Sequence, residues 1–172
     1  MCIRDSAGIV KDNLILRMKE EDWDDVINTN LKGCFNGINS IAKHMIKNKN
    51  GTIITISSMA ALKPGLLGGA PYGAAKAGVT NLMGAINSEF SNDGVRATAI
   101  MPGEVDTPIL NNRAKVPNSG ERETMMKPED LAEIVFLTAN LNSRTNIETV
   151  VVNATYKRDV SDDLKAAREK TN

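Results

Sequence analysis

The chain has 172 residues, 41% of them hydrophobic, and a formal net charge of zero, so it is long enough for one globular core and too short for two ordinary domains. The balanced charge argues against nucleic acid as the main partner, and no run of about 18 apolar residues exists to span a membrane. Because the N-terminus lacks the apolar stretch of a secretory signal, we expect a soluble, cytoplasmic protein. Only two cysteines occur, far apart, which suggests neither a disulfide framework nor a metal site.

The first half of the chain alternates between helical and strand patterns. Apolar residues recur at steps of three and four over 23–46, which predicts one amphipathic helix. A β-branched run predicts a buried parallel strand over 52–57. A loop rich in glycine and proline then leads into a helix predicted over 72–90, and residues 95–101 have the pattern of the next strand.

The second half is less regular. Residues 107–127 show no clear periodicity and are predicted to form a mobile flap. A helix is predicted from Pro128 to about residue 141, followed by a last strand over 147–152. Charges crowd the tail from residue 153 onward, which favours a solvated helix or disorder.

Strands that alternate with helices predict an α/β fold with a parallel sheet and right-handed crossovers. In such sheets ligands sit beyond the carboxyl ends of the strands. This rule places Ser57-Ser58, Pro102-Gly103 and the start of the helix at Tyr72 on one rim, although they are far apart in sequence.

Tyr72 and Lys76 lie four residues apart, which puts a phenol and an ammonium on one helix face. A neighbouring cation stabilises a phenolate. Bringing a tyrosine pKa from about 10 to about 7 requires roughly 4 kcal/mol, and one lysine at about 4 Å supplies a comparable energy at an intermediate dielectric. Taken alone, the pair has a simpler reading, in which Tyr72 opens a helix and Lys76 reaches solvent.

Two further polar residues are candidates for the same site. Ser58 directly follows a strand, where its hydroxyl is placed either to hydrogen-bond a carbonyl substrate or to cap a turn. Asn30 interrupts the apolar stripe of the first helix, so its amide needs partners, either in the core or at the site.

Together these residues resemble the short-chain dehydrogenase/reductase family. The motifs occur in the family order: T-N-L on the long helix, I-S-S at a strand end, Y-x-x-x-K and then P-G-x-V-x-T. The resemblance implies a general acid/base, a lysine that lowers its pKa and holds the nicotinamide ribose, a serine that orients the substrate carbonyl, and an asparagine in a proton relay. By motif these roles fall on Tyr72, Lys76, Ser58 and Asn30, respectively.

The resemblance also implies a nicotinamide cofactor, NAD or NADP, with NADP slightly favoured. Its predicted contacts beyond Tyr72 and Lys76 are Ala7, Gly8, Pro102, Gly103, Val105 and Thr107. The substrate would be a small carbonyl compound or alcohol. The full-length protein would be a homodimer or homotetramer, since members of the family pair through two long helices.

The chain departs from the family in lacking the phosphate-binding turn G-x-x-x-G-x-G and the strand-helix units around it. We therefore expect a C-terminal fragment, in which 1–152 is part of a Rossmann-like domain, 1–6 is foreign to the pattern and 153–172 is a charged tail. The residues that distinguish NAD from NADP would lie in the missing part. The spacing from Ser58 to Tyr72 is also one residue longer than the commonest arrangement.

Segment 11–23 is similar to 3-oxoacyl-carrier-protein reductases, whereas 145–155 is more similar to reductases of assorted small carbonyl compounds or hydroxy acids. Two alternatives to a dehydrogenase remain. The chain is either a catalytically incompetent fragment that binds partners, or a serine hydrolase that uses Ser58 with the single histidine, His44, although G-x-S-x-G is absent.

Overall fold

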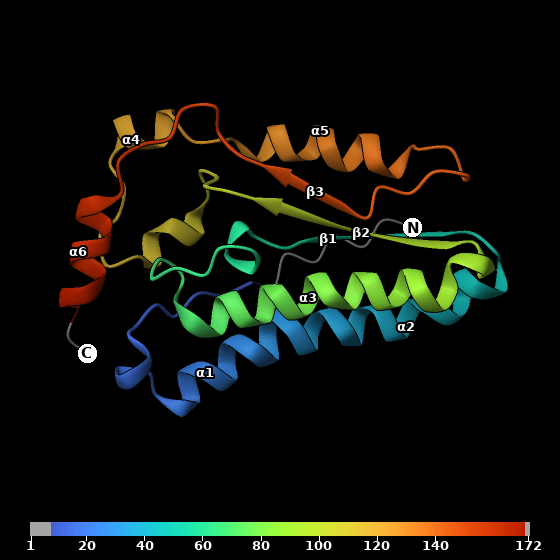
Figure 1. Cartoon of the computed structure of the whole chain (residues 1–172), viewed down its shortest axis with the longest axis horizontal. Coiled ribbons are helices and arrows are strands. Elements are labelled where there is room, and N and C mark those ends of the chain that lie inside the picture. Colours follow the sequence, from blue (N-terminus) through green and yellow to red (C-terminus); the bar gives the residue numbers. More distant parts are fainter. Residues whose placement is uncertain (1–7, 171–172) are drawn as a thin grey trace.

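A computed structural model describes residues 8–170, and its centre is a parallel sheet. The strands are β1 (Gly51–Ile56), β2 (Val95–Pro102) and β3 (Thr149–Val152). They lie in the order β1-β2-β3, with Ile53 opposite Ala97 and Ala99 opposite Thr149 (Figure 1). The predicted α/β fold with a partial, Rossmann-like parallel sheet is confirmed.

Helices flank the sheet on two sides. They are α1 (Glu20–Ile27), α2 (Gly33–Lys47), α3 (Gly69–Phe90), α4 (Ser119–Glu123), α5 (Pro128–Ala139) and α6 (Ser161–Glu169). Figure 1 shows α2 and α3 side by side below the strands and α5 above them. The arrowheads of β2 and β3 point toward the end of the molecule where α4 and α6 lie, so these two helices flank the carboxyl ends of the strands.

The core lies between α3 and the sheet. Met83 and Ile86 of α3 pack against small side chains of β2, Ala97 and Ala99, and all four are at least 97% buried. Alanine on the facing strand lets the helix approach closely, and full burial of a Met or Ile side chain stabilises the fold by about 1.5–3 kcal/mol. The buried apolar side chains of α3 therefore face the sheet.

A buried amide ties α3 to β2. Asn87 donates from Nδ2 to the Ala97 carbonyl at 2.9 Å, and its Oδ1 accepts from the Ala97 N–H at 2.7 Å. Asn146, in the loop before β3, donates to the same Oδ1 at 3.1 Å. One side chain thus satisfies both backbone groups of a buried strand residue.

The helix predicted over 23–46 is present, but a π turn divides it into two α-helical segments. Residues Asn28–Lys32 form a π-helical turn between α1 and α2. A π turn inserts one extra residue and keeps the neighbouring segments helical, so the apolar spacing on either side hides it. Trp23 and Phe35, both counted in the predicted apolar stripe, are 39% and 50% exposed.

The segments after β2 are more ordered than their sequence indicated. Residues 107–127 hold a 3-10 helix, Pro108–Asn112, and α4, with Asn118 and Glu121 forming a reciprocal cap at the start of α4. The tail beyond residue 153 forms α6, in which Asp163 and Ala167 are buried. Ion pairs that join these segments, described below, account for the difference.

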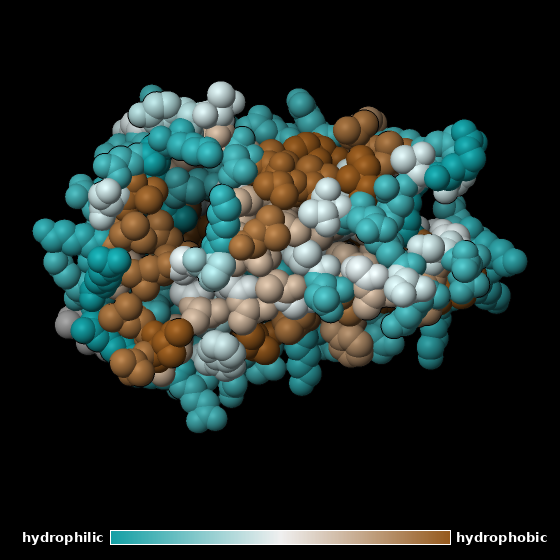
Figure 2. Space-filling model, viewed as in Figure 1, coloured by the Kyte–Doolittle hydropathy of each residue, from teal (hydrophilic) through white to brown (hydrophobic). Residues whose placement is uncertain are grey.

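Apolar side chains gather on the surface over α5 and β3. Phe136, Leu137 and Val151 are 71%, 59% and 48% exposed, and Figure 2 shows brown atoms grouped where Figure 1 draws these elements. Patches of this kind are typical of surfaces that pack against another protein. Within residues 8–170, no helix combines the length and apolarity that crossing a membrane requires.

Candidate active site

Two glycines set the start of α3 and with it the position of Tyr72. Gly68 and Gly69 have φ of 100° and 76°, the left-handed region that L side chains rarely adopt. A Cβ on Gly69 would lie 3.0 Å from the Lys11 carbonyl oxygen and 3.1 Å from the Asp12 Cα, so α3 begins directly against segment 8–14. Tyr72 follows in the first turn of the helix.

Tyr72 meets Ser58 at the carboxyl end of β1. The Ser58 side chain lies close enough to the Tyr72 phenol to lower its pKa, and the Ser58 Oγ accepts a hydrogen bond from the Ala60 N–H at 3.1 Å. Burial raises the pKa of Tyr72, and the Ser58 hydroxyl and the positive charge of Arg113 offset only part of that rise. The structure therefore brings the two predicted residues together, with Tyr72 in its neutral form at pH 7.

Lys76 lies beside Tyr72 but does not act on its phenol in the way the spacing suggested. Its Nζ donates to the Ile56 carbonyl at 2.7 Å and lies 5.6 Å from the centroid of the Tyr72 ring. Burial lowers the pKa of Lys76, and nearby Cys34 opposes that shift. The pKa of Tyr72 is raised and not lowered, because desolvation of the phenol dominates.

Ser57 and Thr80 were not predicted as site residues, yet their side chains fix Lys76 against the sheet. The Ser57 Oγ donates to the Lys76 carbonyl at 2.9 Å and lies 2.8 Å from the Thr80 Oγ1. Ser57 is 2% exposed, and its N–H donates to the Ile100 carbonyl at 2.7 Å. The only signal in the sequence is that Ser57 ends the strand and Thr80 lies four residues after Lys76.

Asn30 lies in the π turn and is 5% exposed. Its Oδ1 accepts from the Ile9 N–H and its Nδ2 donates to the Ile9 carbonyl, both at 2.9 Å. The amide thus holds the segment that carries Gly8, whose Cβ position would be 3.9 Å from the same oxygen. Ala7, the other residue predicted in this segment, lies outside the described residues.

The Pro102-Gly103 turn lies at the carboxyl end of β2, next to the chain that leaves β3. The Gly103 N–H donates to the Val152 carbonyl at 2.8 Å, and a Cβ on Gly103 would come within 2.5 Å of the Asn153 Oδ1. Beyond the turn, Val105 pairs with Met126 in an isolated bridge, and the Thr107 Oγ1 lies 3.5 Å from the Val105 carbonyl oxygen. A side chain at position 103 would require the exposed Asn153 side chain to move.

A cavity of about 430 Å³ opens beside the start of α3. Its lining is mainly polar and comes from three parts of the chain: Ile9, Val10, Lys11, Asp12, Asn13, Met18, Asp22, Asn112 and Lys170. Asp12, 5% exposed, accepts from Lys170 Nζ at 3.0 Å. Since the backbone of Gly69 borders Asp12, the cavity lies close to the turn that carries Tyr72.

Sequence reasoning also missed a group of charged residues around the turn after β2. Glu104 accepts from Arg113 at 2.6 Å and from Arg158 at 2.8 and 2.9 Å, although Arg158 lies 54 residues away. The pattern of charges in the tail gave no indication of this partner. Residues 8–170 hold no cluster of His, Cys, Asp and Glu side chains that could bind a metal ion, and none was predicted.

His44 lies far from Ser58. Its Nε2 contacts the Asn48 Nδ2 at 2.9 Å on the exposed end of α2, and Met45 of the same turn touches Gly51 at the start of β1. Ser58 lies beyond the other end of this strand, about 20 Å away for six residues. The geometry therefore offers no serine-histidine pair.

Comparison with known proteins gives one consistent result. The family model "short chain dehydrogenase" matches residues 2–118. The chain is 38% identical over 144 residues to the 3-oxoacyl-[acyl-carrier-protein] reductase FabG of Thermotoga maritima, covering 78% of this chain and 56% of that protein. It is 36% identical over 153 residues to the FabG of Chlamydia pneumoniae, covering 86% and 61%.

Solved structures agree. A crystal structure of serine dehydrogenase from Escherichia coli superposes with a TM-score of 0.73 at 28% identity, covering 86% of this chain and 61% of that one. A closed form of serine dehydrogenase complexed with NADP+ gives a TM-score of 0.80 at 29% identity, covering 91% and 65%. The chain thus spans less than two thirds of the length of these relatives, and by its family match it belongs to the short-chain dehydrogenases.

Proposed function

We propose that the protein to which this chain belongs is an NAD(P)-dependent oxidoreductase that interconverts a carbonyl and a secondary alcohol. The observation that carries the proposal is the approach of the Ser58 hydroxyl to the Tyr72 phenol at the carboxyl end of the sheet. Two hydroxyls that meet there are placed to share one substrate oxygen. The family match supports the same reaction class.

In this proposal Tyr72 is the general acid/base. During reduction its phenol donates a proton to the substrate oxygen, and during oxidation the phenolate removes that proton. The Ser58 hydroxyl holds the same oxygen. The rise in the pKa of Tyr72 suits the acid role, because the phenol stays protonated until substrate is bound.

The residues present fit the nicotinamide half of a cofactor and not its other half. Lys76, Pro102, Gly103, Val105 and Thr107 lie near the carboxyl ends of β1 and β2, where Lys76 would hold the nicotinamide ribose and the turn would hold the ring. When bound, the nicotinamide supplies or accepts the hydride. The sequence has no G-x-x-x-G-x-G turn for the pyrophosphate, so we expect this chain alone to bind NAD or NADP weakly or not at all.

The cavity beside the start of α3 is the proposed entrance for the substrate, a small carbonyl compound or alcohol. Asn30 is proposed to act indirectly, because both ends of its amide already hold the Ile9 backbone at the edge of that cavity. Pairing through α2 and α3 into a homodimer or homotetramer is proposed for the full-length protein.

The test is a Tyr72→Phe variant of the full-length enzyme, with Tyr156→Phe as the matched control. Loss of the phenol hydroxyl should lower turnover by about 10²–10⁴-fold with a nicotinamide cofactor and carbonyl substrates. Tyr156, which is 64% exposed, should be replaceable without effect. Normal turnover in Tyr72→Phe would refute the assignment.

For this chain alone, a calorimetric titration with NADP should give no tight binding. Tight binding would show that the described residues suffice for the cofactor. The incompetent-fragment alternative predicts the same weak binding, so the full-length variant is the decisive experiment between the two.

A further inference from the structure

We propose that Arg158 is a positioning residue of this enzyme, which holds the turn after β2 and the segment 107–127 against the Tyr72 site through the Glu104 carboxylate. The inference rests on the proposed function, since that turn is part of the site only if a nicotinamide binds there. It adds residues of the C-terminal segment to a site that the motifs placed entirely before residue 108.

Arg158 makes two paired contacts with carboxylates. Its Nε and Nη2 donate to the two Glu104 oxygens at 2.8 and 2.9 Å, and its Nη1 and Nη2 donate to the two Asp163 oxygens at 3.0 and 2.8 Å. The side chain of Arg158 is 6% exposed and that of Asp163 is 1% exposed. Paired contacts on both sides fix a guanidinium in one orientation.

Glu104 links the fixed Arg158 guanidinium to the site, because Glu104 directly follows Pro102-Gly103 in the chain. The same carboxylate accepts from the Arg113 Nη1 at 2.6 Å. Glu104 therefore joins three segments: the turn after β2, the segment 107–127 and the tail before α6. The positive charge of Arg113 in turn acts on the Tyr72 phenol, so the cluster reaches the proposed acid.

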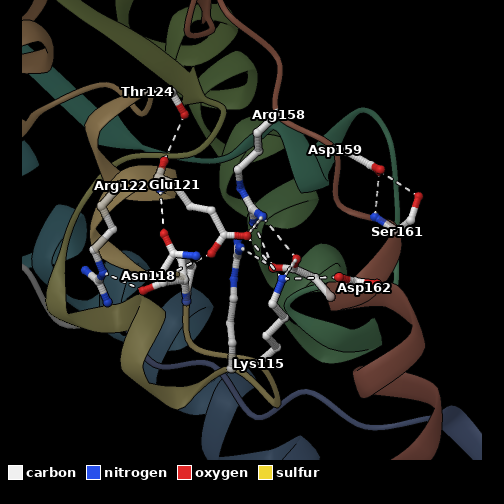
Figure 3. Close-up of polar contacts among 12 residues, drawn as sticks. Lys115, Asn118, Glu121, Arg122, Thr124, Arg158, Asp159, Ser161 and Asp162 are labelled. Atoms are coloured by element: carbon white, nitrogen blue, oxygen red, sulfur yellow. Dashed lines mark hydrogen bonds and ion pairs between the residues drawn. The ribbon is translucent and has the colours of Figure 1, made fainter.

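The other charged side chains of the cluster also contact one another, as Figure 3 shows around Arg158, Lys115 and Glu121. Lys115 lies 3.1 Å from a Glu121 oxygen and 3.5 Å from an Asp163 oxygen, and Arg158 lies 3.4 Å from Glu121. The cluster contains three cations, Arg113, Lys115 and Arg158, and three acids, Glu104, Glu121 and Asp163. Asp162 lies exposed at its edge. Removing one member leaves buried charge uncompensated, which is strongly unfavourable.

Loss of Arg158 has a definite consequence for the geometry. Asp163 would keep only Lys115 at 3.5 Å and Arg113 at 4.0 Å. Arg113 would then be shared between Glu104 and Asp163, and the turn would lose its bond to the tail. A lysine at position 158 would restore the charge without the paired geometry.

The alternative explanation is that the cluster only stabilises the fold. Hydrogen exchange on this chain separates the two explanations, using Arg158→Leu, Arg158→Lys and, as matched control, Arg144→Leu, since Arg144 is exposed. Val79→Ala serves as a variant destabilised in the core, because Val79 is 2% exposed and distant in sequence from the cluster.

The measured quantity is the ratio of the exchange rate of the amides in 103–107 and 109–124 to the exchange rate of the amides in β2. We expect Arg158→Leu to raise this ratio at least tenfold and Arg158→Lys to raise it less. Val79→Ala should speed exchange without changing that ratio, and Arg144→Leu should change neither. An unchanged ratio in Arg158→Leu would overturn the proposal. If that variant does not fold, the Arg158→Lys ratio decides.

The second measurement uses the full-length enzyme with Arg158→Lys, a nicotinamide cofactor and a carbonyl substrate. A positioning role predicts a fall in kcat of about tenfold with a shifted pH profile, which a loss of stability alone would not produce. Unchanged kcat, KM and pH profile in an active enzyme would overturn the role even if exchange changes. If the unaltered full-length protein shows no dehydrogenase activity, the proposed function fails and the positioning role fails with it, and hydrogen exchange then tests only whether Arg158 orders the turn and the segment 107–127.

Discussion

Gly69 is the residue on which the placement of Tyr72 depends most directly. Its φ of 76° and the contact that a Cβ would make at 3.0 Å with the Lys11 carbonyl oxygen both oppose a side chain. Gly69→Ala should therefore lower the free energy of unfolding by about 1–3 kcal/mol, measured in urea.

Gly84 provides the matched control on the same helix. A Cβ there has no atom within 4 Å, and its backbone is helical. Gly84→Ala should raise the free energy of unfolding by about 0.5–1 kcal/mol. Equal effects of the two substitutions would show that the close contact at Gly69 is not a constraint.

The candidate site shows how far a motif predicts residue geometry. The sequence placed Ser58 and Tyr72 at one rim, because strand ends and helix starts meet there by topology. It did not predict that Lys76 donates to Ile56, since a spacing of four residues fixes a helix face and leaves the partner of a long side chain open. Arg113 could not be predicted, because its approach depends on Glu104 and the folded segment after it.

At the scale of elements, α3 and β2 are held together by packing and by Asn87. Asn87→Leu removes the hydrogen bonds to both backbone groups of Ala97, which remain buried. Because each buried unpaired group costs about 1–3 kcal/mol, we expect this substitution to lower the free energy of unfolding, measured in urea, by about 2–4 kcal/mol. The exposed Asn81→Leu on the same helix is the control. A loss below about 0.5 kcal/mol for Asn87→Leu, the size typical of neutral surface substitutions, would contradict this role of Asn87.

Most elements could be predicted because local pattern decides them. The stripe of α3 and the β-branched run of β1 each carry their own period. The π turn at Asn28–Lys32 could not be predicted, because a one-residue bulge preserves the apolar spacing on both sides. The sequence predicts a mobile flap over 107–127 and a solvated or disordered tail, because the ion pairs that order these segments join residues up to 54 positions apart.

At the scale of the whole molecule, the solvent-accessible surface area of the chain is large for its mass. The chain exposes 10525 Å² at 18.6 kDa, whereas a compact monomer of this mass exposes about 8,200 Å². The charged cluster around Arg158 is one of the contacts that join distant segments of this chain.

The cluster gives the whole molecule a specific acid sensitivity. Burial raises the pKa of Glu104 and of Asp163, but Arg158 and Arg113, with Lys115 at Asp163, together outweigh it, so both pKa values lie below their ordinary range. A carboxyl whose pKa is lowered by folding binds fewer protons in the folded state than in the unfolded state. Its stabilisation is therefore complete above its ordinary pKa and is lost as the pH falls through the lowered value.

We expect the free energy of unfolding to decrease from about pH 5 toward pH 2, and to decrease less steeply in Arg158→Leu. The variant is already destabilised at pH 7, because its carboxyls have lost the partner that favoured their charged form. Other acids with lowered pKa, such as Asp106 and Asp22, pair elsewhere and contribute equally to both proteins. Urea unfolding at several pH values measures the slopes, with Arg144→Leu as the control. Parallel slopes in the two proteins would mean that the carboxyls of Glu104 and Asp163 do not owe their low pKa to Arg158.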